Sequence, residues 1–237
     1  MEGTMSDLGE EGLKTWSSIL QSHEKTRKAQ VVDIFTNGIE YLGFTPEKIP
    51  DLKQVNKKLK SRGGFRGVFV SGLEDGKRFY TMLARKEFPI GNFIRSHKDL
   101  SYTPEPDIVH DLYGHLPYFT DPEYSGFCEK FAKAACRFLD RPEQLRQFER
   151  FFWFTVEFGL VRTKNGTRIF GAGIASSVGE CEYALSGRPE IIPFSVDSVR
   201  RQEFRIDQMQ TKLFLLESPE QLYSSLDELT RKIEAKK

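Results

Sequence analysis

Two histidines in one short, proline-bounded stretch are the residues of this sequence best suited to chemistry. The protein contains four histidines, and His110 and His115 stand five residues apart. Pro106 precedes them and Pro117 follows, which predicts a helix of about two to three turns, because proline suits the first turn of a helix and interrupts its interior. Imidazole nitrogens are common ligands of transition metals, so a shared metal ion is the first chemistry to consider.

The spacing of these histidines is unfavourable for a regular α-helix. Residues i and i+4 lie nearly on one face, whereas residues i and i+5 diverge by about 140°. Gly114 and Pro117 loosen the last turn, so we expect His115 to leave helical register and turn toward the metal that His110 faces. A zinc-hydrolase motif of the H-E-x-x-H kind is not matched, because Asp111 follows His110 and the spacing is one residue longer.

Two imidazoles hold a catalytic metal weakly, so a third ligand is expected elsewhere. Glu157 stands in the apolar run 151–160, where an ionised carboxylate needs a partner to offset its desolvation. Two neutral histidines and one carboxylate form the facial triad of non-haem iron(II) oxygenases, which leaves three coordination positions open. On spacing alone, histidines satisfied in the core or at the surface remain the alternative interpretation.

Three longer segments resemble one enzyme family. They are the runs Tyr102–Pro117, Trp153–Leu160 and Gly171–Glu180. In this order they are similar to the pterin-dependent aromatic amino acid hydroxylases, the family of phenylalanine, tyrosine and tryptophan hydroxylases. The similarity extends from about Trp16 to about Tyr223, and the segments 84–89 and 204–207 most resemble the bacterial phenylalanine hydroxylases.

The resemblance implies a monooxygenase that uses Fe(2+), a tetrahydropterin (tetrahydrobiopterin or a related reduced pterin) and O2 as co-substrate. His110, His115 and Glu157 would hold the iron, and the ring of an aromatic amino acid would be hydroxylated. Trp153 stands where phenylalanine and tyrosine hydroxylases carry tryptophan, and the apolar Ile206 stands where tyrosine hydroxylases tend to carry aspartate. The expected reaction is therefore phenylalanine to tyrosine, with tryptophan or tyrosine hydroxylation as the alternative.

The resemblance also assigns residues to the substrate and to the pterin. Arg95 would pair with the carboxylate of the amino acid, a task that suits a planar two-pronged donor, and Phe79 would stack on the pterin ring. The other substrate-binding positions are Thr103, Asp107, Trp153, Ser176, Glu180 and Ile206, and the other pterin-binding positions are Gly72, Leu73 and Asp111. On local grounds alone, a core residue of an amphipathic helix is the better interpretation of Phe79. Ser176 is equally compatible with a helix N-cap and Glu180 with an exposed helix carboxylate.

Two departures from the family pattern keep other functions open. Phe152 stands where relatives usually carry tyrosine, and Glu74–Gly76 replace a more apolar pterin loop, so a different reduced pterin is one alternative. A metal-binding or pterin-binding protein without turnover is a second alternative. A zinc-dependent hydrolase that uses the same two histidines and glutamate is a third.

Composition bounds the remaining possibilities. The chain has 237 residues, of which 38% are apolar and 29% charged, and a net charge of +1, so neither a nucleic-acid nor a membrane partner is indicated. Three cysteines without C-x-x-C spacing and the lack of a signal-peptide pattern predict a reduced, cytoplasmic protein. We expect a disordered tail at 1–10 and a single hydroxylase catalytic domain at 11–237. A regulatory N-terminal domain and a heptad-rich tail are missing from the sequence, so a monomer is expected.

The elements that must position these residues are mostly helical. The expected fold class is α+β, the catalytic-domain fold of the resembled family, with a few short strands. Helices are predicted at 11–42 (one long or two), from Pro50–Asp51 to Gly63–Gly64, and at 77–86, 106–117, 121–140, 142–159, 177–185 and 219–235. Strands are predicted at 65–72 and 169–174, with a hairpin turn at Asn165–Gly166 and two short extended pieces within 204–216.

Overall fold

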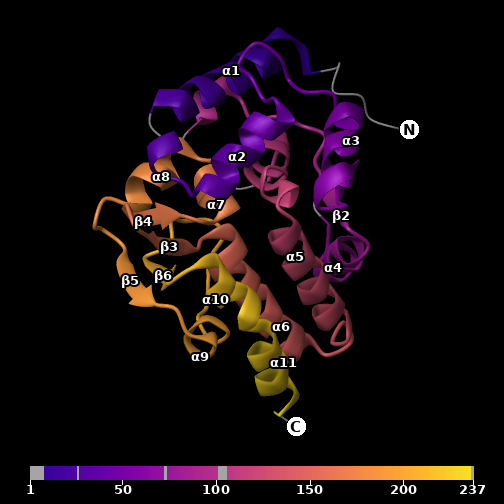
Figure 1. The fold of residues 1–237 in the computed structure, drawn as a ribbon, viewed down its shortest axis with the longest axis vertical. Coiled ribbons are helices and arrows are strands. Elements are labelled where there is room, and N and C mark those ends of the chain that lie inside the picture. Colours follow the sequence, from indigo (N-terminus) through magenta and orange to yellow (C-terminus); the bar gives the residue numbers. More distant parts are fainter. Residues whose placement is uncertain (1–7, 26, 72–73, 101–105, 236–237) are drawn as a thin grey trace.

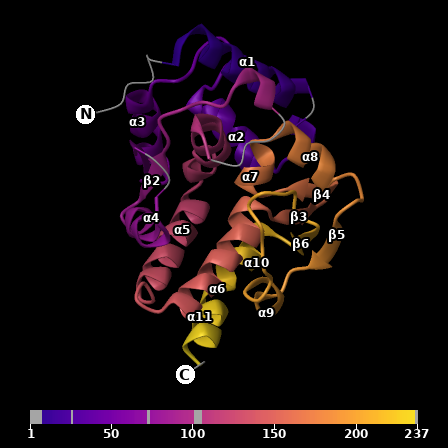
Figure 2. The same ribbon diagram turned by 180° about the vertical axis from the view of Figure 1, so that it is seen from behind.

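Helices dominate the architecture, and the few strands are short (Figures 1 and 2). The structure is a computed structural model that describes residues 8–25, 27–71, 74–100 and 106–235. Strands gather in a two-stranded sheet and a four-stranded sheet. The expected α+β fold class is confirmed. Within the described ranges, no helix is both long and apolar enough to cross a membrane.

The N-terminal part forms two helices and a short 3-10 turn before a third helix. Helix α1 spans Gly9–Lys25, a 3-10 turn spans Arg27–Ala29, α2 spans Asp33–Leu42 and α3 spans Leu52–Arg62. The Asp51 side chain accepts hydrogen bonds from the first turn of α3, which explains why the helix begins there. Because α1 begins at Gly9, the end of the expected loose tail is helical, whereas residues 1–7 lie outside the described residues.

A β–α–β unit follows. Strand β1 (Arg66–Phe69) pairs in parallel with β2 (Glu87–Ile90), and helix α4 (Gly76–Ala84) connects them. Parallel strands need such a crossover, so α4 is the element that makes the pairing possible. Strand β1 and helix α4 were expected from the sequence, whereas β2 was not.

Two π-helical segments and two long helices form the middle of the chain. The π-helices span Val109–His115 and Trp153–Glu157, and a 3-10 turn spans Tyr118–Thr120. Helix α5 spans Pro122–Cys136, and α6 spans Pro142–Phe152 and runs directly into the second π-helix. Phe131 of α5 lies 5.5 Å from Phe148 and 5.8 Å from Phe151 of α6, measured between ring centroids, so aromatic side chains hold these two helices together.

The C-terminal part is built on the four-stranded sheet, whose order is β4-β3-β6-β5. The strands are β3 Leu160–Thr163, β4 Gly166–Ile169, β5 Glu190–Pro193 and β6 Lys212–Leu216. Strands β3 and β4 form the expected antiparallel hairpin, whereas β3 with β6 and β5 with β6 are parallel. The helices of this part are α7 Ala172–Ala175, α8 Val178–Ala184, α9 Val196–Val199, α10 Pro219–Ser224 and α11 Leu226–Glu234.

Three predictions for this part were wrong in detail. The expected strand 169–174 ends at Ile169 and continues as α7, because a Cβ at Gly171 would overlap the Glu157 carbonyl and the glycine allows α7 to pack there instead. Of the two extended pieces expected within 204–216, one forms a strand, β6. The closing helix is divided at Ser225 into α10 and α11.

The segment between α1 and α2 is hydrogen-bonded to the four-stranded sheet. Ile169 at the end of β4 accepts a backbone hydrogen bond from Val32 (3.0 Å) and donates one to Gln30 (2.8 Å). Helix α2 presses its Gly38 against Pro117, just after the histidine-bearing π-helix, so closely that a Cβ on Gly38 would overlap the Pro117 backbone. The two halves of the chain therefore meet around the segment that carries the histidines.

This contact gives a stability prediction. Replacing Gly38 by alanine should lower the free energy of unfolding by about 2–3 kcal/mol, because the added methyl group fits only if the Pro117 backbone moves. Gly126, inside α5, has no atom within 4 Å of its virtual Cβ, so Gly126→Ala is the matched control and should be neutral or stabilising by up to about 1 kcal/mol. Urea unfolding of the three proteins measures both effects, and equal midpoints for G38A and wild type would contradict the prediction.

Candidate active site

The two histidines lie on a π-helix, not on an α-helix that loosens at its end. Hydrogen bonds in a π-helix run between residues five apart, so each turn holds one residue more than an α-turn. His110 and His115 therefore face the same side, with ring centroids 4.8 Å apart. The expectation that Gly114 frees His115 from helical register is corrected, because the whole segment Val109–His115 is widened.

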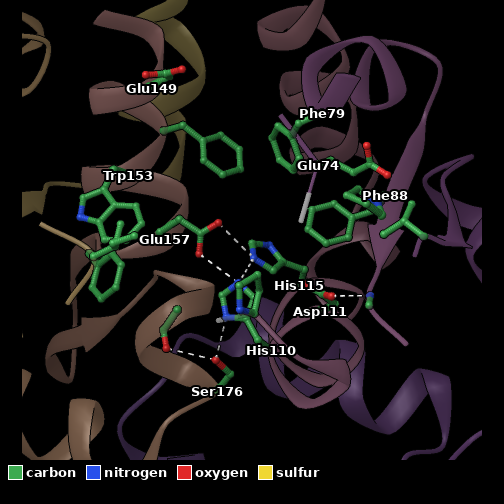
Figure 3. A pocket seen from close by; sticks show the side chains of 18 of the residues that line it. Glu74, Phe79, Phe88, His110, Asp111, His115, Glu149, Trp153, Glu157 and Ser176 are labelled. Atoms are coloured by element: carbon green, nitrogen blue, oxygen red, sulfur yellow. Dashed lines mark hydrogen bonds and ion pairs between the residues drawn. The ribbon is translucent and has the colours of Figure 1, made fainter. Parts of the chain in front are cut away.

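The carboxylate of Glu157 meets both histidines. It stands at the end of the second π-helix, and its Oε1 lies 3.1 Å from His115 Nε2 while its Oε2 lies 3.7 Å from His110 Nε2. The two Nε2 atoms lie 3.1 Å apart. Figure 3 shows the three side chains converging on one point from two helices. Side chains from two distant segments of the sequence are thus brought together as expected for a triad.

The geometry of this group fits a metal ion. Protein N and O donors sit about 2.0–2.2 Å from a transition metal, so neighbouring donors of an octahedral ion lie about 3 Å apart. The closest approaches between the three side chains are 3.1, 3.1 and 3.7 Å and involve both oxygens of Glu157, and one ligand atom from each residue lies within 4.8 Å of the others, so the three can share one ion. Glu157 Oε2 is buried without a hydrogen-bond partner among the described residues, as an atom reserved for a ligand would be.

The protonation of these groups also suits metal binding. Burial lowers the pKa of His110 to about 4, so its imidazole is neutral at pH 7. Burial alone would raise the pKa of Glu157, but His115 and His110 beside it hold that pKa below its usual value. A neutral imidazole and an ionised carboxylate are the forms in which both side chains bind metals.

Ser176 selects the tautomer of His110. The Ser176 hydroxyl donates to the Gly173 carbonyl at 3.1 Å and lies 3.3 Å from His110 Nδ1. Since the hydroxyl has one proton, it accepts from Nδ1–H, which leaves the lone pair of Nε2 free on the side of Glu157. The cap of α8 is Ser177, whose side chain accepts from the Glu180 amide, so Ser176 is not the N-cap.

Arg95 and Asp107 form a buried ion pair beside the triad. Asp107 Oδ1 accepts from Arg95 Nη2 (2.7 Å) and from the His110 amide (3.0 Å), and Oδ2 accepts from Arg95 Nε (3.0 Å) and the Arg95 amide (2.7 Å). Asp107 thus occupies the Nε/Nη2 edge of the Arg95 guanidinium, and the Nη1/Nη2 edge keeps donors for the expected contact with a substrate carboxylate. Nη1 stays buried without a partner among the described residues and is the donor left for a ligand.

A cavity of about 650 Å³ opens over the triad, and its walls are largely aromatic. On one side Trp153 stacks between Phe158 and Phe204, with centroids 4.6 and 4.4 Å away. On the other side Phe79 meets Phe88 and Phe152 edge-on, at 6.0 and 5.4 Å. Figure 3 places Trp153 on one side of the triad and Phe79 and Phe88 on the other, so the cavity has two aromatic walls with the histidines between them.

The structure places the remaining predicted residues as follows. Asp111 faces the cavity, accepts from the Gly91 amide at 2.7 Å, and has a pKa raised well above its usual value by burial. Glu180 also lines the cavity and is 4% exposed, so it is not the exposed helix carboxylate. Ile206 lies at the cavity rim and is 57% exposed. Gly72, Leu73 and Thr103 lie outside the described residues.

Several cavity residues were not found from the sequence. They are Phe88, Arg146, Glu149, Phe158 and Phe204. Phe88, Phe158 and Phe204 lie within the segments that resemble the family, so their position in the chain carried a signal. Glu149 and Arg146 lie on α6, which continues directly into the π-helix that ends at Glu157. Because the helix changes from α to π geometry between them, α-helical spacing does not predict that they line the same cavity as Glu157.

The geometry defines a class of site. Two imidazoles and one carboxylate, beside an aromatic cavity with an arginine donor that has no partner among the described residues, make a ligand set of the type that holds the single metal ion of non-haem iron oxygenases.

Comparison with known proteins identifies the family within that class. The family of biopterin-dependent aromatic amino acid hydroxylases matches residues 5–236. The phenylalanine-4-hydroxylase of Pseudomonas aeruginosa is 34% identical over 216 residues, which cover 91% of this chain and 81% of that protein. The chain therefore belongs to the biopterin-dependent aromatic amino acid hydroxylases.

Solved structures agree with this membership. The structure of phenylalanine hydroxylase from Chromobacterium violaceum with bound iron(III) and 7,8-dihydrobiopterin is similar with a TM-score of 0.92 at 31% identity, covering 100% of this chain and 87% of that one. The phenylalanine hydroxylase of Legionella pneumophila is similar with a TM-score of 0.87 at 35% identity, covering 97% of this chain and 92% of that one. The expected resemblance to the bacterial enzymes is confirmed.

The buried Glu180 gives a prediction on pH. Burial raises its pKa from 4.5 to about 7, so between these values the folded protein holds a proton that the unfolded chain has lost. Stability from this group is therefore present at low pH and is lost as the pH rises through 7. The pKa shift predicts that, between pH 5 and pH 8, the free energy of unfolding of the wild type falls by about 2–3 kcal/mol relative to that of Glu180→Gln.

Urea unfolding of both metal-free proteins at several pH values measures this difference. Asp111 also has a raised pKa, but it is present in both proteins and cancels in the comparison. Parallel stability curves for wild type and E180Q would show that Glu180 is ionised in the folded protein at pH 5.

Proposed function

We propose that this protein is an iron(II)- and tetrahydropterin-dependent monooxygenase that converts phenylalanine to tyrosine. The observation that carries the proposal is the triad: one ligand atom from each of His110, His115 and Glu157 lies within 4.8 Å of the others, beside an aromatic cavity that all three line. The names of similar proteins supply the substrate and the cofactors, since the relatives are phenylalanine hydroxylases and one of them holds iron and a dihydropterin.

The cofactors would occupy the triad and the wall that carries Phe79. His110, His115 and Glu157 would hold the iron, and Phe79 would stack on the pterin ring with Asp111 at its edge. When bound, the iron and the reduced pterin supply the activation of dioxygen and the transfer of one oxygen atom to the ring. We propose that Gly72 and Leu73 complete the pterin site, as the family resemblance implies.

Arg95 would hold the substrate by its carboxylate. Its buried Nη1 has no partner among the described residues, and a carboxylate is the ligand that best satisfies a buried guanidinium donor. Asp107 bonds both Arg95 and the His110 amide, so it fixes the substrate anchor relative to the metal helix. Thr103 would contact the backbone of the bound amino acid.

The aromatic walls would orient the substrate ring and exclude water. Trp153, which stacks on Phe204 and contacts Phe158 in a tilted arrangement, would form with them an aromatic surface against which a phenyl ring packs. Ser176 and Glu180 line the same cavity, and Ile206 adds an apolar side chain at its rim. An apolar rim favours phenylalanine over tyrosine, whose hydroxyl would need a polar partner there.

Two further expectations remain proposals. We propose that the protein is a monomer, which gel filtration with light scattering tests, and that it works in the cytoplasm. Small molecules are its proposed partners, with neither nucleic acid nor membrane involved.

The function is tested with iron-loaded protein, tetrahydrobiopterin and oxygen. Phenylalanine should give tyrosine, while tyrosine and tryptophan should react more slowly, as chromatography of the products will show. Glu157→Gln should lower bound iron and tyrosine formation by about 100-fold or more, because one of three ligands loses its charge. Glu149→Gln is the matched control, since Glu149 lines the cavity outside the triad.

The outcomes separate the candidate functions. Bound iron with no product from any of the three amino acids would indicate binding without turnover. Oxygen uptake that requires iron(II) and phenylalanine would exclude the zinc-dependent hydrolase, whereas no oxygen uptake with iron(II), tetrahydrobiopterin and any of the three amino acids would overturn the oxygenase assignment.

The role of Arg95 is tested by Arg95→Lys. The variant keeps the charge but loses the planar fork that Asp107 grips, so the KM for phenylalanine should rise about 10-fold or more while bound iron stays unchanged. Arg146→Lys, at the exposed rim of the same cavity, is the control and should leave the KM within about twofold. An unchanged KM in R95K would remove Arg95 from substrate binding.

A further inference from the structure

A buried polar cluster lies behind the histidine-bearing π-helix and outside the cavity. Tyr113, within that helix, is completely buried, and its hydroxyl lies 2.7 Å from His23 Nδ1 in α1. Arg27 is also completely buried, and its guanidinium lies 5.1 Å from the Tyr113 ring centroid. None of these three is among the described residues that line the cavity, so the function proposed above gives them no role.

The direction of the Tyr113–His23 hydrogen bond is fixed by its surroundings. Burial, together with the charges of Arg27 and Lys28, lowers the pKa of His23 to about 4, so the imidazole is neutral at pH 7. Burial raises the pKa of the Tyr113 hydroxyl, so it keeps its proton. Because His23 Nδ1 is the only partner of the Tyr113 hydroxyl among the described residues, donation from Tyr113 to Nδ1 is the direction that leaves the buried hydroxyl proton paired.

The ring of Tyr113 is enclosed on several sides. Trp16, His23 and Phe35 meet it edge-on, with centroids 6.4, 5.7 and 5.4 Å away and interplanar angles of 82–88°. Arg27 lies over its face. Helices α1 and α2 and the 3-10 turn between them thus provide a socket that holds one side chain of the π-helix. The socket is defined here as Trp16, His23, Arg27 and Phe35.

The same socket reaches His110 by a second route. Arg27 donates through Nη2 to the Ile19 carbonyl and through Nη1 to the Ala175 carbonyl, the latter at 3.2 Å. Ala175 precedes Ser176, whose hydroxyl lies 3.3 Å from His110 Nδ1. The socket therefore contacts both the helix that carries the histidines and the segment that orients one of them.

The π-helix needs such a restraint. Segments with this register are rare and less favourable than an α-helix of the same sequence, so outside contacts must maintain them. If Val109–His115 returned to α geometry, residues five apart would diverge by about 140°, and the two imidazoles would no longer share a ligand.

We propose that Tyr113, held by its hydrogen bond to His23, is a positioning residue that keeps the π-helical register and so keeps His110 and His115 on one metal ion. This inference rests on the metal site of the proposed function. It assigns to the socket a task beyond stability, since the socket sets the geometry of two ligands that it does not touch.

The test is Tyr113→Phe, which keeps the ring and removes the hydroxyl. Cobalt(II) is the probe, because its visible absorption reports ligand geometry and its affinity is measured by competition with a chelator. Tyr113→Phe should raise the cobalt dissociation constant about tenfold and change the absorption bands, an effect of the size seen for residues behind metal ligands. The thermal midpoint of the metal-free protein is measured in parallel.

Matched variants separate positioning from stability. Tyr118 is equally buried and its hydroxyl has no partner among the described residues, so Tyr118→Phe should leave affinity and spectrum unchanged. His23→Asn keeps an acceptor near the position of Nδ1 and should retain cobalt affinity, whereas His23→Leu should reproduce Y113F.

The results distinguish the possible failures. Cobalt affinity and spectrum unchanged in both Y113F and H23L, with or without a lower thermal midpoint, would overturn the positioning role and leave the proposed function intact. A wild-type protein that binds neither cobalt(II) nor iron(II) would overturn the proposed function, and this inference with it.

Discussion

The register of one π-helix is the constraint on which the rest of the site depends. Histidines five residues apart share a metal only if each turn of the helix holds an extra residue, and Val109–His115 has that geometry. The second π-helix, Trp153–Glu157, brings the carboxylate to the same point. Both segments are buried, so the packing of α1, α2 and α7 around them is what keeps a rare backbone form in place.

The carboxylate of Asp107 has two structural roles at this site. Asp107 uses both oxygens to grip Arg95 and also caps the His110 amide, so the substrate anchor and the metal helix cannot shift independently. An ion pair this deeply buried contributes little net stability, since desolvation offsets its attraction. The ion pair matters for geometry, because it holds Arg95 Nη1, which has no partner among the described residues, at a fixed place in a largely aromatic cavity.

Sequence patterns predicted much of this arrangement, and the exceptions have physical causes. Helix ends followed from caps such as Asp51, and the hairpin from Asn165–Gly166, because these signals are local. The resemblance of three sequence segments to one family predicted that His110, His115 and Glu157 share a metal ion. The π register was missed because helical periodicity assumes 3.6 residues per turn, and β2 and the cavity residue Glu149 were missed because tertiary packing places them.

The ties between the two ends of the sequence affect how the chain can fold during synthesis. Arg27 is bonded to the carbonyl of a residue 148 positions later, and Gln30 and Val32 pair with Ile169. At about 5–20 residues per second, a ribosome needs on the order of ten seconds to supply those partners. Until then, Arg27 and the backbone around it stay solvated. The N-terminal helices are thus made well before their partners and are among the last parts to be completed, which favours late, cooperative closure of the site.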